Sequence, residues 1–190
     1  QVDPSVTVSG VISDGAVFTA GQVLATVSGP AASILTAERV ALNFVQRLSG
    51  IATLTSAFVA KVARTGCRAR IADTRKTTPG LRALEKHAVA AGGGVNHRFS
   101  LSDTIMLKDN HLAALGATEG PGLTEAIQKV KATTGHTTSI IVEVDRLDQI
   151  APVLEAGVTG ILLDNFTTEQ LRAGVDQVAG RCVVEASGGV

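Results

Sequence analysis

From residue 69 onward, short apolar runs alternate with segments of helical periodicity. The helical segments are residues 80–91, 122–134, 146–156 and 168–179. The apolar runs are Ala69–Asp73, Thr104–Lys108, Ser139–Val144, Gly160–Asp164 and Cys182–Ala186, with a weaker one at Gly94–Arg98. This alternation predicts parallel strands joined by right-handed helical crossovers, which limits this part of the chain to an α/β fold.

The apolar runs end on charged or hydrogen-bonding residues. In a parallel barrel, the carboxyl ends of the strands converge on one face, and the active site lies there. The run ends therefore predict one site that gathers eight side chains. These are Arg75, Lys76, His97, Arg98, Lys108, Glu143, Asp164 and Ser187. A doubly wound open sheet would also gather strand ends, but from fewer strands at one switch point, so we favour a barrel.

The first third of the chain has a different pattern. Residues 1–30 alternate apolar and small polar residues between glycine turns, which indicates part of a β-sandwich of the lipoyl type. A swinging-arm carrier needs a lysine at a hairpin tip, and the first lysine is Lys61, so that function is excluded. Residues 36–64 predict helix, with Thr36 as N-cap and a break at Ser49–Gly50. We therefore expect two domains, residues 1–66 and 67–190.

Charge is balanced overall but unevenly placed. The formal net charge is zero, which argues against a general nucleic-acid or membrane-surface role. Residues 67–111 hold eight Lys/Arg and four Asp/Glu, whereas residues 112–190 hold five Lys/Arg and ten Asp/Glu. Such halves suit a site that takes a polyanion on one side and a metal ion or cationic centre on the other, although chance scatter of surface charge gives the same counts.

Two further observations bear on the setting of the protein. No apolar run reaches the ~18 residues of a membrane span, so none is expected. Cys67 and Cys182 are too far apart in sequence for a metal-binding motif, and each precedes an apolar run, so we expect buried, reduced thiols. This fits a cytoplasmic protein.

The cations at the predicted site suit a multiply charged anion. Arg75 and Arg98 can bind carboxylates or phosphates in bidentate fashion, while Lys76 and Lys108 act as point charges. Lys76 taken alone could equally be a solvated loop lysine. The Ser187–Gly189 segment offers a hydroxyl and backbone N–H groups to a phosphate, a weak signal on its own.

The two carboxylates leave several roles open. Glu143 and Asp164 could accept sugar hydroxyls, hold Mg²⁺, stabilise a developing carbocation or form structural ion pairs. His97 could donate to a carboxylate or simply pack at a strand end, and His111 could orient its loop. The chain has no Trp and no Tyr, so recognition of the substrate must be mostly electrostatic.

Six motifs, in order along the chain, carry a resemblance to a known family. They are TAERVALNFVQRLSGIAT, ADTRKTTPGLRALEKHAVAAGGGVNHR, LKDNH, VEVD, LLDNF and EASGGV. Together they resemble quinolinate phosphoribosyltransferase, also called nicotinate-nucleotide pyrophosphorylase (carboxylating). The resemblance implies an N-terminal α/β sandwich followed by an open, parallel, seven-stranded α/β barrel. It also implies a reaction: quinolinate and phosphoribosyl pyrophosphate (PRPP) give nicotinate mononucleotide, pyrophosphate and CO₂ in NAD biosynthesis, with Mg²⁺ as the only cofactor.

The resemblance also implies residue roles. Catalytic residues would be Lys76, Lys108, Glu143 and Asp164, with Glu143 and Asp164 facing the ribose and Mg²⁺, directly or through water. Substrate would further contact Thr74, Arg75, His97, Arg98, Ser187, Gly188 and Gly189. Arg39 would reach quinolinate from the neighbouring subunit of a homodimer, a role that its helical position alone does not suggest.

Family members are longer at both ends, so we expect that the chain is truncated and that its activity in isolation is doubtful. Two rival functions stay open. One is a related phosphoribosyltransferase, either the paralogue linked to molybdenum transport or a nicotinate phosphoribosyltransferase. The other is a non-catalytic homologue that binds nucleotides or partners, against which the complete set of cations and carboxylates argues.

Overall fold

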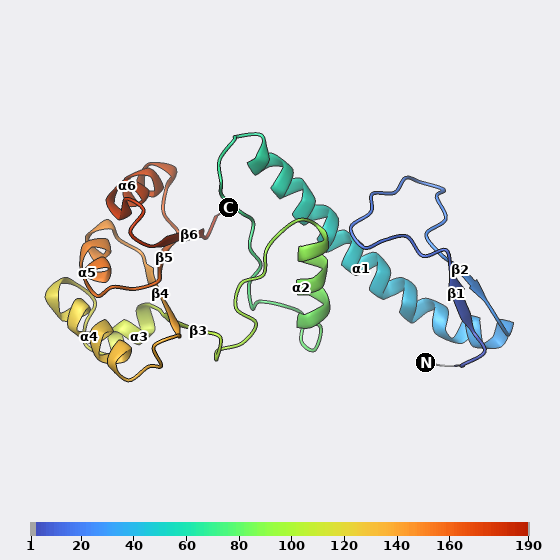
Figure 1. Ribbon diagram of the computed structural model, residues 1–190, viewed down its shortest axis with the longest axis horizontal. Helices are drawn as coiled ribbons and strands as arrows, with labels where there is room; N and C mark the ends of the chain where they lie inside the picture. Colours follow the sequence, from blue (N-terminus) through green and yellow to red (C-terminus); the bar gives the residue numbers. More distant parts are fainter. Residues whose placement is uncertain (1–2, 190) are drawn as a thin grey trace. The chain divides into compact units, whose positions relative to one another are not determined.

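The computed structural model describes residues 3–189 and divides the chain into two compact units, Gln1–Phe99 and Ser100–Val190 (Figure 1). Two helices dominate the first unit, and a four-stranded sheet with its helices makes up the second. The domain boundary predicted from the sequence, between residues 66 and 67, differs from the division after Phe99 and stays a prediction.

The first unit begins with two short strands and continues with two helices. Strand β1 (Thr7–Ser9) pairs antiparallel with β2 (Thr26–Ser28), with Val8 opposite Val27. Helix α1 spans Ala31–Ala63 and helix α2 spans Arg82–Ala91. The predicted β-character of residues 1–30 is therefore confined, within the described residues, to these two three-residue strands, and turns and extended chain make up the remainder.

Helix α1 is longer and more continuous than expected. Its 33 residues are uninterrupted through Ser49 and Gly50, so the predicted break is wrong. Thr36 is also not the N-cap: the helix begins after Pro30, and the Thr36 hydroxyl donates to the Ala32 carbonyl one turn earlier, over 2.8 Å. An alanine-rich helix of about 50 Å tolerates one glycine, whose cost is about 1 kcal/mol.

Helix α2 packs against α1, and a glycine makes the close approach possible. A Cβ on Gly92, directly after α2, would lie 2.4 Å from the Ala52 carbonyl oxygen and 2.8 Å from Thr55 Cβ. No larger residue fits there without moving one helix. Thr55 is correspondingly buried, although most of α1 is exposed or half-buried.

Two predicted strands of the first unit are reduced to a single bridge. Ala72 and Val95 form an isolated parallel bridge in place of strands at 69–73 and 94–98. Two backbone hydrogen bonds accompany it, from Val95 to Ile71 (2.8 Å) and from Asp73 to Val95 (3.1 Å). The segments pair at this one point only, so they do not form a strand ladder. The helix predicted at 80–91 begins two residues later than expected, at Arg82, and Pro79 lies in the turn before it.

The second unit is a parallel sheet with helices between its strands. The strands are β3 (Thr104–Leu107), β4 (Ser139–Val144), β5 (Gly160–Asp164) and β6 (Val183–Ser187), in the order β3-β4-β5-β6. The helices are α3 (Asp109–Ala114), α4 (Gly120–Ala132), α5 (Ile150–Glu155) and α6 (Thr168–Val178), with a 3₁₀ turn η1 (Leu147–Gln149) before α5. Each strand pairs in parallel with its neighbour, which confirms the predicted βαβ order. The sequence pattern did not predict α3.

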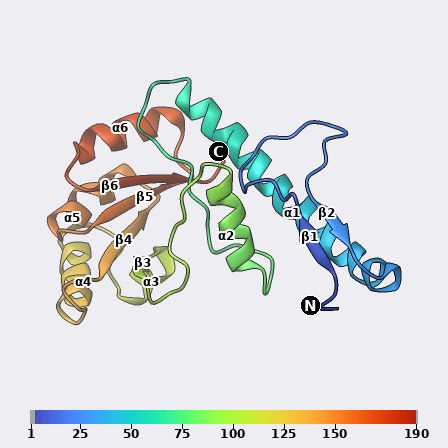
Figure 2. The ribbon, with the colours of Figure 1, turned by 45° about the vertical axis from the view of Figure 1, so that its right-hand side comes forward.

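The core of the second unit lies between the sheet and its helices. Figure 2 shows α4, α5 and α6 along one side of the sheet. Val142, Val144, Ile161 and Leu163 from the strands are fully or almost fully buried in one cluster. The helices contribute Leu112, Leu123, Ile127, Ile150, Val153 and Val178 to that cluster. Because side chains alternate along a strand, the residues between these strand positions face the other side of the sheet.

Two other expectations concern the cysteines and the membrane. Cys67 is exposed and Cys182 is half-buried, so the prediction of two buried thiols is wrong. Cys67 lies in the loop that leaves α1, where no core packs over it. In residues 3–189 we find no helix with both the length and the apolar character that crossing a bilayer requires.

Candidate active site

Lys108 and Glu143 form an ion pair at the carboxyl ends of β3 and β4. Lys108 Nζ lies 2.6 Å from Glu143 Oε2. The pair follows from the register, because Leu107 is opposite Val142 and the next residues along both strands become neighbours. The Glu143 side chain is 14% exposed and that of Lys108 is 43% exposed. The carboxylate is thus partly withdrawn from water while the ammonium group reaches solvent.

The backbone after β3 is fixed by His111. The Lys108 N–H donates to His111 Nδ1 over 3.0 Å at the start of α3. This bond makes Nδ1 the acceptor and therefore places any ring proton of neutral His111 on Nε2. The prediction that His111 orients its loop agrees with this contact.

Asp164 and Ser187 form a second contact at the carboxyl ends of β5 and β6. They are the last register pair of these strands, and the Ser187 hydroxyl donates to Asp164 Oδ1 over 2.7 Å. The Asn165 amide donates to Asp164 Oδ2 over 2.7 Å. Both carboxylate oxygens are therefore oriented, while each keeps further lone pairs for a ligand.

The loop after β6 approaches Asn165 closely. Gly188 has a φ of +84°, and a Cβ there would lie 2.1 Å from Asn165 Oδ1. Asn165 itself has a positive φ of 58°, which asparagine tolerates better than most residues. Its N–H donates to the Ser187 carbonyl over 2.9 Å. Only glycine satisfies both constraints at position 188.

Lys108, Glu143, Asp164 and Ser187 share the face of the sheet that lies opposite the helices. Glu143 is next to Leu162, and Leu162 is next to Glu185 on β6. Glu185 therefore lies on the same face as Glu143 and Asp164, two residues before Ser187. Glu185 was not among the predicted residues, although strand alternation from Ser187 places it on this face.

The first unit holds the other predicted binding residues, which are Arg39 on α1 and two segments that follow it. Thr74, Arg75 and Lys76 follow the Ala72 bridge, and the Thr74 hydroxyl accepts the Lys76 N–H over 3.0 Å. Lys76 is exposed, whereas Arg75 is half-buried. Arg75 Nε is buried and has no hydrogen-bond partner within the described residues. A buried, unsatisfied guanidinium donor is costly, and a bound anion would satisfy it.

The second segment contains His97 and Arg98, both half-buried. Arg39 lies on α1 and is exposed. The structure thus brings Lys108, Glu143, Asp164, Ser187 and Gly188 to one edge of the sheet, with Gly189 next along the chain. It places Arg39, Thr74–Lys76 and His97–Arg98 in the other unit.

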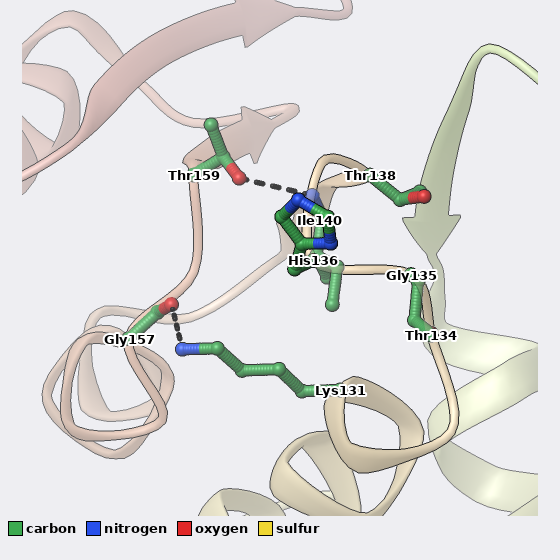
Figure 3. Close-up of a pocket in the computed structure, with 8 residues that line it drawn as sticks. All are labelled: Lys131, Thr134, Gly135, His136, Thr138, Ile140, Gly157 and Thr159. Atoms are coloured by element: carbon green, nitrogen blue, oxygen red, sulfur yellow. Dashed lines mark hydrogen bonds between the residues drawn. The ribbon is translucent and has the colours of Figure 1, made fainter.

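A pocket of about 80 Å³ lies at the opposite edge of the sheet (Figure 3). Lys131, His136 and Thr159 are among the residues that line it, near the amino ends of β4 and β5. Lys131 Nζ donates to the Gly157 carbonyl over 2.7 Å. None of the predicted site residues lines this pocket.

The carboxylates suit a magnesium ion that is shared with a substrate. Within residues 3–189, no group of three or more His, Cys, Asp or Glu side chains is arranged as a complete metal site. Mg²⁺ commonly takes only one or two protein carboxylates and completes its shell with water and substrate phosphates. Glu143 and Asp164 have oxygen lone pairs available for that purpose.

Comparison with known proteins places the chain in a family. A model described as the N-terminal domain of quinolinate phosphoribosyl transferase matches residues 2–49, and the model of its C-terminal domain matches residues 51–190. The chain belongs to the quinolinate phosphoribosyltransferase family. The predicted α/β fold class is confirmed by these matches and by the solved structures of the family.

Individual relatives agree. The chain is 45% identical over 177 residues to a probable nicotinate-nucleotide pyrophosphorylase (carboxylating) of Bacillus subtilis, with 93% of this chain and 59% of that protein covered. It is 46% identical over 182 residues to the nicotinate-nucleotide pyrophosphorylase (carboxylating) of Mycobacterium leprae, covering 94% and 61%. The crystal structure of NadC from Streptococcus pyogenes has a TM-score of 0.89 at 43% identity and covers 100% of this chain and 65% of that one. The chain therefore spans about 60% of the length of these curated relatives.

Proposed function

We propose that the complete protein carrying this chain transfers the phosphoribosyl group of PRPP to quinolinate. The products are nicotinate mononucleotide, pyrophosphate and CO₂, in the de novo synthesis of NAD. The observation that carries the proposal is the oriented carboxyl edge of the sheet, where Lys108 pairs with Glu143 and Ser187 orients Asp164. Membership of the family supports the same assignment.

The cations suit substrates that carry several negative charges. We propose that Arg75, His97, Arg98 and Lys108 bind the two carboxylates of quinolinate, and that Thr74, Arg75 and Lys76 bind the pyrophosphate of PRPP. The buried Nε of Arg75 supports this role, because an anion would supply its missing acceptor. We propose that Ser187, Gly188 and Gly189 donate to phosphate oxygens.

The carboxylates suit the charge that develops during transfer. Departure of pyrophosphate leaves ribose C1 with oxocarbenium character, so negative groups nearby lower the barrier. Glu143 and Asp164 lie on the same face of neighbouring strands and are both held by neighbours. We propose that they face the ribose.

We further propose that Glu143 and Asp164 hold Mg²⁺, directly or through water. When bound, the ion would neutralise the leaving pyrophosphate. The cations of this chain would share that task, since Lys76 and Arg75 are proposed to bind its oxygens. After transfer, the C–C bond to the carboxylate next to the pyridine nitrogen breaks and CO₂ leaves, the cationic nitrogen stabilises the electron pair left on the ring carbon, and a proton from water then binds there, so no organic cofactor is required.

We propose a cytoplasmic homodimer in which Arg39 reaches the site of the other subunit. Helix α1 supports a partner contact, because Arg39 is exposed and several apolar residues near it are exposed too. These are Leu35, Val40, Leu42, Phe44 and Val45. A two-fold dimer would bury this surface in both subunits at once.

One assay tests the proposal. The complete protein is incubated with quinolinate, PRPP and Mg²⁺, and CO₂ and pyrophosphate are measured separately. We expect both products in equal amounts, with none when quinolinate is replaced by nicotinate. Release of pyrophosphate from PRPP with nicotinate as acceptor, but not with quinolinate, would assign the protein to the other phosphoribosyltransferases. Release of neither product would make it a non-catalytic homologue.

A further inference from the structure

Helix α2 holds two loops through three neighbouring side chains. Arg82, Glu85 and Lys86 occupy positions i, i+3 and i+4, so they lie on one face of the helix. Arg82 donates to the Arg75 carbonyl over 3.2 Å, and Glu85 accepts the Thr78 N–H over 3.1 Å. The far end of the loop that contains Arg75 and Lys76 is therefore tied to α2.

Lys86 is the deepest of the three. Its side chain is 3% exposed, and Nζ lies 2.5 Å from Oδ1 of Asp73, whose side chain is 7% exposed. Nζ also donates to the His97 carbonyl over 2.9 Å. One ammonium group thus joins the residue before Thr74 to the residue before Arg98.

Asp73 also binds the His97 segment directly. Its Oδ1 accepts the His97 N–H over 2.8 Å. With the Asn96 amide turned so that its nitrogen faces acceptors, that nitrogen donates to Asp73 Oδ2 over 2.7 Å and to the Lys86 carbonyl over 3.0 Å. The carboxylate is satisfied by three separate groups, and all of them belong to α2 or to the His97 segment.

Stability alone does not explain a buried pair of this kind. Burying two charges removes their hydration, and well-packed apolar residues of similar volume are often as stable or more stable. The backbone around the pair gains little from regular structure, since the two segments share only the single Ala72–Val95 bridge. The side chains therefore supply the order that a strand ladder would otherwise provide.

We propose that Lys86 and Asp73 form a positioning pair for the substrate site. The pair fixes Thr74–Lys76 and His97–Arg98 in one arrangement, so that their cations are placed before an anion arrives. It touches the backbone of these segments and does not itself contact substrate. The proposal rests on the proposed function, which assigns the two segments to substrate binding.

The test compares single and double substitutions in the complete protein. Lys86→Met and Asp73→Asn each leave one buried charge without its partner, so we expect a lower melting temperature in both. The double variant Lys86→Met/Asp73→Asn has no lone charge, so its melting temperature should return most of the way to that of the wild type. Its affinity for quinolinate and for inorganic pyrophosphate should nevertheless stay on the order of 10- to 100-fold weaker, the scale of a small misplacement of binding groups.

A second measurement does not depend on activity. Hydrogen exchange followed by mass spectrometry should show faster exchange in peptides that cover residues 73–78 and 95–99 of the double variant. Peptides from α4 to α6 should exchange as in the wild type. Asp73→Glu keeps both charges but lengthens the side chain, and it should show the same local loosening in case the double variant does not fold.

Ile127→Ala is the matched control, because Ile127 is fully buried in α4 and lies in the other unit. It should lower the melting temperature while leaving affinity and exchange in the two loops unchanged. Wild-type affinity and exchange in the double variant and in Asp73→Glu would overturn the positioning role. A wild-type protein that fails to turn over quinolinate would refute the proposed function instead, and the exchange experiment would still decide the role of the pair.

Discussion

The hydroxyl of Ser187 donates a 2.7 Å hydrogen bond to Asp164 Oδ1, so the last residue of β6 orients the last residue of β5. The amide of Asn165 holds the other oxygen of the same carboxylate. A group fixed at both oxygens presents its remaining lone pairs in a defined direction. The loop that follows Ser187 packs against Asn165, so it also affects the orientation of the Asp164 carboxylate.

Gly188→Ala should disrupt this arrangement. The new Cβ would lie 2.1 Å from Asn165 Oδ1, so Asn165 must leave its place beside Asp164. Loss of one hydrogen bond to a charged group costs about 1.5–3 kcal/mol, or roughly 10- to 150-fold, and we expect kcat/KM to fall in that range.

Gly180→Ala separates strain from the clash. Gly180 also has a positive φ, of 75°, but no atom lies within 4 Å of the position that a Cβ would take there, and the residue follows α6 at the other end of β6. Both variants should lose about 1–2 kcal/mol of stability through backbone strain, measured by chemical denaturation. Only Gly188→Ala should also show a lower kcat/KM. Equal kcat/KM values in Gly188→Ala and Gly180→Ala would contradict the role of Asn165.

Lys108→Ala should weaken quinolinate binding, and Glu143→Gln should mainly slow turnover. Removing one partner of a buried charge pair costs about 2–5 kcal/mol, or roughly 30- to 4,000-fold. Because the Lys108 side chain is 43% exposed, water screens the pair and we expect the lower end. Calorimetric titration of quinolinate and steady-state kinetics measure the two effects.

Lys129→Ala provides the comparison for Lys108→Ala. Lys129 is an exposed lysine near the end of α4, so its removal changes net charge equally without touching the sheet edge. Its quinolinate affinity should match the wild type. A Lys108→Ala protein that also matches the wild type would leave Lys108 with a structural role only.

Arg39 should act in the site of the partner subunit. Mixing two variants with weakened quinolinate binding, Arg39→Ala and Lys108→Ala, under conditions of subunit exchange produces heterodimers, which are assayed at a quinolinate concentration well below saturation. One site of each heterodimer lacks both groups and the other is intact, so activity should return toward about a quarter of the wild-type level if exchange is random. No recovery, with heterodimers present by native mass spectrometry, would place Arg39 in its own subunit's site or outside any site.

Glu85 should stabilise the protein in a pH-dependent way. Hydrogen bonds from Thr78 and Arg47 hold the pKa of Glu85 below its ordinary value of 4.5. The folded state therefore binds this proton less readily than the unfolded state, and the stabilisation is complete above pH 4.5 and is lost as the pH falls through the lowered pKa.

Denaturation of the wild type and of Glu85→Gln from neutral pH down to acid pH measures this effect. We expect the gap in the free energy of unfolding to be largest near neutral pH and to close toward the acid end. A constant gap would mean that the charge of Glu85 contributes nothing. Glu125→Gln, at an exposed position on α4, is the control and should show no such trend.

The sequence predicted secondary structure best where a short run of apolar residues was clearly bounded. Strands at 139–144 and 160–164 matched the structure at both ends, because consecutive Val, Ile and Leu residues in a short run leave little choice of element. It failed where tertiary contacts decided. Gly50 did not interrupt α1, and residues 69–73 and 94–98 formed one bridge although their composition resembles a strand.

The gathering of candidate residues at the carboxyl edge of the sheet could be predicted for a similar reason. Lys108, Glu143, Asp164 and Ser187 follow or end apolar runs, and parallel pairing brings such ends to one edge. Arg39 came only from the family resemblance, because an exposed arginine on a helix has no distinguishing pattern. Lys86 and Asp73 escaped notice since no sequence pattern shows that two charges 13 residues apart are buried together.

The buried Lys86–Asp73 pair also restricts how this sequence can change over generations. Losing either partner costs about 3–5 kcal/mol, a large share of the roughly 5–15 kcal/mol by which a typical domain is stable. An apolar pair at the same two positions could be as stable, yet each single step toward it passes through a lone buried charge. Single substitutions at either position are therefore disfavoured. Proteins that descend from this one should keep both residues or replace both.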